Sequence, residues 1–162
     1  MKNIVLIGIM GCGKTTLAQM LSDKLNRPMV DIDQYIEEKY QMSISDMFAI
    51  SEDYFRERET ICSKEVAQKE NMIISTGGGV IKNEENMRAL KKNGLVFYID
   101  RPIEDIITDV DTSKRPLLQE DAKRLYALHK ERNALYTQYC DYHIINNKTL
   151  DEVLEDILAC LS

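Results

Sequence analysis

One segment near the amino terminus carries residues whose types and spacing suit phosphate chemistry. Gly8, Gly13, Lys14 and Thr15 stand at the spacing G-x-x-x-x-G-K-[ST]. Glycines let a backbone curl so that several N–H groups face phosphate oxygens, and a following helix adds the positive end of its dipole. In such a loop the lysine reaches the outer phosphates of a nucleotide, and the threonine hydroxyl ligates Mg²⁺. The pattern therefore predicts a nucleotide site at residues 8–15.

The nucleotide is expected to be ATP. Proteins that select guanine usually carry a separate Asn-Lys-x-Asp element. Asn146, Asn147 and Lys148 come near that pattern, but no aspartate stands at the required place.

Two carboxylates follow shortly after the phosphate loop. Asp31 and Asp33 end a short predicted strand, and side chains two apart on a strand share a face. The carboxyl ends of parallel strands are where open α/β sheets bind ligands. One carboxylate is therefore expected to hold Mg²⁺ through water and the other a substrate hydroxyl. The alternative is that Asp33 caps a helix over residues 34–40, a common role for aspartate.

Two further segments can each be interpreted in two ways, as part of a ligand site or as ordinary structure. In Phe55–Glu59, Glu59 falls on the apolar face with Phe55, and the fork of Arg56 suits a carboxylate ligand; otherwise these charges form a solvated helix face. Gly77, Gly78 and Gly79 follow a predicted strand, where a backbone approaches a ligand closely, or they form a flexible turn.

Cations near residues 110–132 have the same two readings. Lys114 and Arg115 lie in an aperiodic stretch, and a loop cation closing over phosphates would neutralise charge during phosphoryl transfer. Arg132 lies on the helix that follows. The alternative for each is an ordinary surface charge.

Apolar runs alternate with amphipathic stretches along the chain, which predicts strands and helices in turn. Strands are expected at residues 4–7, 29–31, 72–75, 95–99 and 142–145. Helices are expected at residues 14–25, 33–40, 44–49, 52–69, 83–92, 102–109 and 121–139, with a last helix capped by Thr149 and Glu152. Residues 110–119 are expected to be a mobile loop. This alternation predicts an α/β fold with a parallel sheet covered on both faces.

Composition limits the function classes. The 162 residues fit one domain, and 21 Lys and Arg against 27 Asp and Glu give a net charge of −6. An acidic chain without Trp argues against nucleic-acid binding, and no apolar run is long enough to span a membrane. The cysteines form no C-x-x-C pair and the two histidines are far apart, which argues against zinc. Scattered thiols favour a cytoplasmic location.

Six short motifs in one order resemble those of the shikimate kinase family, a branch of the small P-loop kinases. The resemblance covers nearly the whole chain, and although the later motifs are weak alone, six in order are specific. They are G-x-x-G-x-G-K-T at 8–15, D-x-D at 31–33, F-R-x-x-E at 55–59, G-G-G at 77–79, R-P-L-L at 115–118 and R-x-x-L-Y at 132–136.

The resemblance implies a fold: one domain over residues 1–162, built as three α/β/α layers around a five-stranded parallel sheet of order 2-3-1-4-5. It also implies a substrate-binding helical segment at 33–61 and a mobile lid at 109–120.

The resemblance also implies roles for individual residues. The nucleotide would be bound by Gly11, Cys12, Gly13, Lys14, Thr15, Thr16 and Arg115, and Mg²⁺ by Thr15 with Asp31 acting through water. Lys14, Asp33 and Arg115 would be catalytic. The shikimate site would comprise Asp33, Phe48, Phe55, Arg56, Glu59, Gly78, Gly79 and Arg132, with Ile44 at its edge. Within it, Arg56 and Arg132 would bind the substrate carboxylate, and Glu59 would fix Arg56.

The activity implied is transfer of the γ-phosphoryl group of ATP to the 3-hydroxyl of shikimate, in aromatic amino acid biosynthesis, by a monomer. One position departs from the family pattern, because Thr108 stands where many members have an arginine that stacks on adenine. Two other readings stay open at this point. One is another small-molecule kinase, of the gluconate or nucleoside monophosphate type; the other is a nucleotide-binding module without transfer activity.

Overall fold

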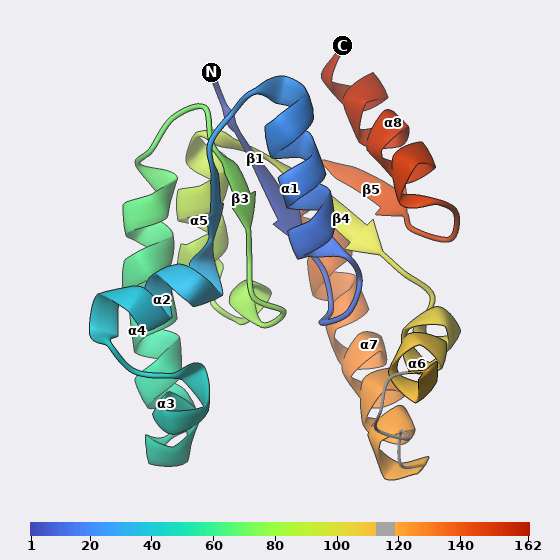
Figure 1. The fold of residues 1–162 in the computed structure, drawn as a ribbon. Helices are drawn as coiled ribbons and strands as arrows, with labels where there is room; N and C mark the ends of the chain where they lie inside the picture. The colour runs from blue at the N-terminus through green and yellow to red at the C-terminus, as the bar shows by residue number, and fades with distance from the viewer. Residues whose placement is uncertain (113–118) are drawn as a thin grey trace.

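Five short strands lie parallel in a single sheet in the computed structural model, which describes residues 1–112 and 119–162 (Figure 1). Their order across the sheet is β2-β3-β1-β4-β5, which confirms the predicted order 2-3-1-4-5. The strands are β1 (Asn3–Ile7), β2 (Met29–Asp31), β3 (Ile73–Ser75), β4 (Gly94–Asp100) and β5 (Tyr142–Ile145).

Helices cover both faces of this sheet, as the alternating pattern predicts. In Figure 1, α1 and α8 lie in front of the sheet, and α5 and α7 lie behind it. A separate group is formed by α2 and α3, which both pack on α4. The helices are α1 (Lys14–Leu25), α2 (Ile32–Tyr40), α3 (Ile44–Ile50), α4 (Glu52–Ala67), α5 (Glu84–Lys92), α6 (Ile103–Thr112), α7 (Gln119–Tyr139) and α8 (Leu150–Leu161), with a 3₁₀ turn η1 (Val80–Lys82).

The core is built around the two central strands. Every residue of β1 is buried, and β4 is buried from Val96 to Ile99. Strands covered on both faces lose the alternation of polar and apolar residues, which explains why these segments appear in the sequence as continuous apolar runs.

Two local predictions differ from the structure. The cap of α2 is Asp31, whose Oδ1 accepts a hydrogen bond from the Gln34 amide at 3.1 Å, so Asp33 lies inside the first turn instead of capping it. The aperiodic stretch is also shorter than expected at both ends, because α6 continues to Thr112 and α7 begins at Gln119. In the sequence, Ile103, Ile106, Ile107 and Val110 have the spacing of one apolar helix face, which favours a helix past residue 109. Residues 113–118 lie outside the described part of the chain.

Because all five strands are parallel, their carboxyl ends meet at one edge of the sheet. Each end leads into a segment rich in polar residues or glycine, at residues 8–13, 31–33, 76–79, 101–102 and 146–149. The chain after β1 moves to one side of the sheet and β4 lies on the other side of β1, so this edge is also a topological switch point. The fold thus gathers the polar segments where α/β proteins bind ligands. Among the described residues, no helix has the length and apolar character needed to cross a membrane.

The opposite edge of the sheet depends on one buried amide. The Asn3 side chain is 1% exposed, donates to the Lys69 carbonyl at 2.8 Å and accepts from the Met72 amide at 2.8 Å. We expect Asn3→Ala to lower the free energy of unfolding by about 1–3 kcal/mol, because it leaves both backbone groups without this partner. Urea denaturation would measure the loss. The exposed neighbour offers the control Lys2→Ala, and equal stability of the two variants would contradict the role given to Asn3.

Candidate active site

The phosphate loop joins β1 to α1 through three glycines that no other residue replaces easily. Gly8, Gly11 and Gly13 have φ of 152°, 80° and 98°, a region that side chains with a Cβ rarely adopt. A Cβ on Gly8 would also lie 2.5 Å from the Ile99 carbonyl oxygen. The backbone therefore curls as the sequence motif predicts.

Lys14 spans this loop from inside. Its side chain is buried, and Nζ donates to the Gly8 carbonyl at 2.5 Å and to the Ile9 carbonyl at 3.1 Å. Cys12 is also buried, and its carbonyl accepts a hydrogen bond from Asn146 Nδ2 at 2.8 Å. The loop is thus held from two directions. The Lys14 ammonium group holds it from inside, and Asn146, the residue directly after β5, holds the Cys12 carbonyl.

Thr15 and Asp31 bring hard oxygen ligands to the mouth of the loop. Thr15 Oγ1 donates to Asp31 Oδ2 at 3.3 Å, while the other Asp31 oxygen caps α2. Hydroxyl and carboxylate oxygens are the ligands that Mg²⁺ prefers, and Mg²⁺ usually keeps several waters beside one or two protein ligands. The donor set at this point therefore fits Mg²⁺.

Asp33 is a carboxylate with an unusual environment. Burial, followed by the negative charges of Asp31 and Glu59, raises the pKa of Asp33 to about 6, against the opposing effect of Lys14 and Arg56. Asp33 Oδ1 is buried and has no hydrogen-bond partner among the described residues. A Cβ on Gly77 would lie 2.7 Å from that oxygen, so a glycine there makes room for the carboxylate.

Two adjoining cavities share Asp33, Gly77 and Gly78 on their walls. The larger cleft, of about 900 Å³, contains the phosphate loop and the carboxyl ends of β4 and β5. The smaller cavity, of about 350 Å³, lies between the glycine segment and α2, α3, α4 and α7. Asp33 is therefore the titratable group at the junction of a phosphate site and a second site.

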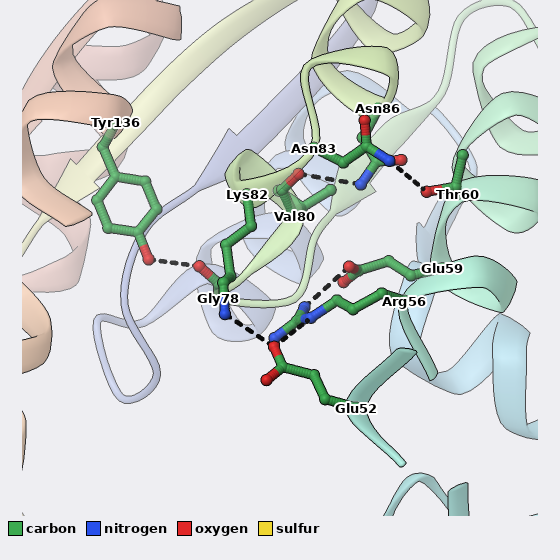
Figure 2. A network of polar contacts seen from close by, with 10 residues as sticks. All are labelled: Glu52, Arg56, Glu59, Thr60, Gly78, Val80, Lys82, Asn83, Asn86 and Tyr136. Carbon is green, nitrogen blue, oxygen red and sulfur yellow. Dashed lines mark hydrogen bonds and ion pairs between the residues drawn. The ribbon is translucent and has the colours of Figure 1, made fainter. Parts of the chain in front are cut away.

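The smaller cavity is built around a guanidinium held by two carboxylates (Figure 2). Arg56 Nη1 lies 2.9 Å from Glu59 Oε1, and Arg56 Nε lies 3.2 Å from Glu52 Oε2, which also pairs with Lys82 at 2.7 Å. Glu59 is 1% exposed; burial raises its pKa and the Arg56 charge opposes that effect. The solvated reading of this segment is therefore wrong for Glu59, which orients Arg56 from within the protein.

Other walls of this cavity combine aromatic rings with a second guanidinium. Phe48 and Phe55 stack with ring centroids 4.7 Å apart, and the Arg56 guanidinium lies 5.1 Å from the Phe55 centroid. Arg132 comes from α7, and its Nε is buried with no hydrogen-bond partner among the described residues. A cavity with two guanidinium groups and an apolar wall suits a small acid that carries a ring.

Most of the predicted residues come together here. Within the described chain, the larger cleft is lined by Gly11, Gly13, Lys14, Thr15, Thr16, Asp31, Asp33 and Gly78. The smaller cavity is lined by Asp33, Ile44, Phe48, Phe55, Arg56, Glu59, Gly78, Gly79 and Arg132. Although Cys12 belongs to the loop, its side chain is buried and does not line the cleft. Arg115 falls outside the described residues.

Among the residues of the larger cleft that the sequence did not mark as site residues, Arg101 and Asn146 hold the phosphate loop. Arg101, directly after β4, donates to the Gly11 carbonyl at 3.0 Å and forms an ion pair with Asp109 at 2.5 Å. Asn146, directly after β5, holds the Cys12 carbonyl and lines the same cleft. Their position at strand carboxyl ends was the available signal. The Thr108 side chain is exposed, does not line the larger cleft, and donates through its hydroxyl to the Glu104 carbonyl within α6.

Comparison with known sequences points to one family. A model of the shikimate kinase family matches residues 10–162. The shikimate kinase of a Clostridium botulinum strain is 47% identical over 158 residues, which cover 97% of this chain and 96% of the relative. The Clostridium beijerinckii shikimate kinase is 40% identical over 158 residues, covering 97% and 94%.

Solved structures agree. The shikimate kinase of Acinetobacter baumannii, determined in complex with shikimate, superposes with a TM-score of 0.91 at 33% identity, covering 99% of this chain and 93% of that one. The Aquifex aeolicus enzyme gives a TM-score of 0.86 at 36% identity, covering 98% and 95%. With the phosphate loop, the shared carboxylate and the paired guanidinium groups already in place, these matches show that the chain belongs to the shikimate kinase family of P-loop kinases.

Proposed function

We propose that this chain transfers the γ-phosphoryl group of ATP to the 3-hydroxyl of shikimate. One observation carries the proposal: Asp33 lies on the walls of both the phosphate cleft and the cavity of Arg56 and Arg132. A carboxylate at that junction is close to both the acceptor hydroxyl and the phosphoryl group that this hydroxyl attacks. Family membership and a relative that binds shikimate support the choice of acceptor.

The phosphate loop would bind ATP through backbone N–H groups and the Lys14 ammonium. Lys14 now donates to two loop carbonyls, and phosphate oxygens would become further acceptors for the same group. Arg115 would add a second positive charge to the transferred group from the 109–120 lid. The proposed nucleotide-binding residues are Gly11, Cys12, Gly13, Lys14, Thr15, Thr16 and Arg115.

Thr15 and Asp31 would hold Mg²⁺, the former directly and the latter through water. The ion, when bound, supplies charge neutralisation of the phosphate oxygens. The existing Thr15–Asp31 hydrogen bond supports this assignment, because it already places the Asp31 carboxylate beside the Thr15 hydroxyl.

The second cavity would bind the carboxylate end of shikimate through Arg56 and Arg132. Glu59 would keep the Arg56 fork in place, while Phe48 and Phe55 would face the ring and Gly78 and Gly79 would offer backbone contacts. Holding the far end of the acceptor fixes its hydroxyl at the near end, where binding energy is converted into orientation.

Asp33 would orient the 3-hydroxyl and accept its proton. The hydroxyl oxygen forms a bond to the γ-phosphorus while the bond from that phosphorus to the β–γ bridging oxygen breaks, so ADP leaves and the proton stays on Asp33. Such a transfer needs positioning and charge neutralisation more than covalent help. Lys14 and Arg115 would supply the charge neutralisation. A carboxylate with a raised pKa is a stronger base than an ordinary aspartate.

We further propose that residues 1–162 form one domain that acts as a monomer, with a substrate-binding helical segment at 33–61. The free thiols of Cys12, Cys62, Cys140 and Cys160 support a reducing, cytoplasmic setting.

The specific claim is tested by coupled detection of ADP release. Purified protein with ATP and Mg²⁺ should turn over on addition of shikimate, and a panel of gluconate and nucleoside monophosphates should not replace it. ADP release no faster with shikimate than without acceptor would contradict the proposal. Turnover on a panel compound instead would favour another small-molecule kinase.

Asp33→Asn tests the role of the shared carboxylate. We expect kcat to fall by about 100-fold or more, the lower range for a general base, with the ATP dissociation constant near that of the wild type. Because ionised Asp33 is unfavourable in its buried setting above pH 6, the variant should also be more stable at pH 8 by roughly 1–3 kcal/mol. Asp53→Asn, on the exposed start of α4, is the matched control. Loss of ATP binding in the Asp33 variant would overturn the assignment.

The raised pKa of Asp33 predicts a pH dependence. Because burial raises it to about 6, half of the free protein carries a protonated Asp33 at that pH. We expect kcat/KM for shikimate to fall as the pH drops below 6, roughly tenfold per unit, since this ratio reports ionisation of the free enzyme. An acidic limb centred near pH 4, the ordinary range of aspartate, would count against Asp33 as the base.

A further inference from the structure

A buried tyrosine contacts the glycine segment at residues 77–79. Tyr136 lies on α7, its side chain is 0% exposed, and its hydroxyl donates to the Gly78 carbonyl at 2.5 Å. The substrate roles proposed above use Arg132 from the same helix but leave Tyr136 without one. The two residues are one helical turn apart and therefore lie on the same face of α7.

Both of these side chains meet the same residue. A Cβ on Gly78 would lie 3.4 Å from Arg132 Nη1, and the Gly78 carbonyl is the acceptor of Tyr136. One turn of α7 thus places a guanidinium and a phenol beside Gly78. The hydroxyl therefore ties α7, which also carries Arg132, to the glycine segment.

The direction of this hydrogen bond has a consequence for the next amide. In a trans peptide the carbonyl of one residue and the N–H of the next point in opposite directions, and the chain has no cis bond among its described residues. Fixing the Gly78 carbonyl toward Tyr136 therefore turns the Gly79 N–H away from it. Figure 2 shows Tyr136 on one side of Gly78 and Arg56 on the other. A Cβ on Gly79 would lie 2.5 Å from Arg56 Nη1, so Gly79 borders the guanidinium cavity on the side away from Tyr136.

The phenol is itself held firmly. Its ring lies 4.9 Å from that of Tyr98, whose hydroxyl donates to Asn133 Oδ1 at 2.9 Å. Burial raises the pKa of Tyr136 to about 12, against the opposing charge of Arg132. The hydroxyl therefore remains protonated, and able to donate, throughout the neutral range.

We propose that Tyr136 is a positioning residue for the acid substrate: its hydroxyl orients the Gly78–Gly79 peptide so that the Gly79 amide faces the substrate carried by Arg56 and Arg132. It acts without touching the substrate. The inference rests on the proposed function for the identity of that substrate, and on the contacts of Tyr136 for the orientation of the peptide.

Tyr136→Phe separates this role from simple packing, because it keeps the ring and removes the hydroxyl. We expect KM for shikimate to rise roughly three- to tenfold, the factor for one lost hydrogen-bonded contact, while KM for ATP stays within about twofold. Tyr98→Phe is the matched control, since it removes a hydroxyl from the same ring pair without freeing the Gly78 carbonyl. We expect the control to leave both KM values within about twofold of wild type.

Two kinetic outcomes would overturn the proposal. One is an unchanged KM for shikimate in Tyr136→Phe. The other is a parallel rise of KM for shikimate and ATP in both variants, which is what loosened packing alone would produce. Thermal unfolding of both variants shows whether their stabilities match, so that a KM change confined to shikimate cannot come from partial unfolding.

A measurement without turnover keeps the two proposals distinguishable. The ¹H and ¹⁵N chemical shifts of the Gly79 amide in the free protein should move in Tyr136→Phe and stay in Tyr98→Phe; an unmoved amide in Tyr136→Phe would overturn the inference. If wild-type protein neither binds nor phosphorylates shikimate, the proposed function fails, whereas the amide comparison still decides whether Tyr136 orients this peptide.

Discussion

The site depends on keeping one carboxylate buried between two groups of cations. Asp33 has negative neighbours in Asp31 and Glu59 and positive ones in Lys14 and Arg56, and burial outweighs the cations in setting its pKa. If the cations dominated, Asp33 would be an ordinary ion-pair partner with little basicity. If it were more exposed, water would compete for the hydrogen bond to an acceptor hydroxyl. The two cavities have to meet at this residue for either property to be useful.

Although the net charge is −6, both cavities have cations on their walls. Lys14, Arg56 and Arg132 line the two adjoining cavities. Two of these side chains are held in place by local partners: Lys14 by loop carbonyls, and Arg56 by Glu59 and Glu52. A restrained guanidinium loses little conformational entropy on binding, so its partners contribute to affinity without touching a ligand. The larger cleft also has carboxylates on its wall, at Asp31, Asp33, Asp105, Asp109 and Glu152, so its cations lie among negative charges.

How much of the fold and of the site can be predicted from the sequence depends on how local each feature is. The phosphate loop, the strand order and the pairing of Arg56 with Glu59 follow from short motifs, helix spacing and the family resemblance, and the structure agrees with each. Contacts between distant segments do not follow in that way. Asn146 reaches the Cys12 carbonyl across 134 positions, and no spacing rule connects these residues. The cap of α2 was missed for another reason, because two aspartates on one strand end compete and only backbone geometry decides between them.

The glycine segment after β3 lets residues of α2, α4 and α7 come close to one point. A Cβ on Gly77 would meet Asp33 of α2 at 2.7 Å, and a Cβ on Gly79 would meet Arg56 of α4 at 2.5 Å. Each missing side chain thus makes room for a different site residue, which is why a flexible turn alone does not account for them. A segment with so little side chain would have a poorly defined backbone if nothing held it. The tyrosine behind it supplies that restraint from the helix that also carries Arg132, so the same contact that orders the backbone places the second guanidinium.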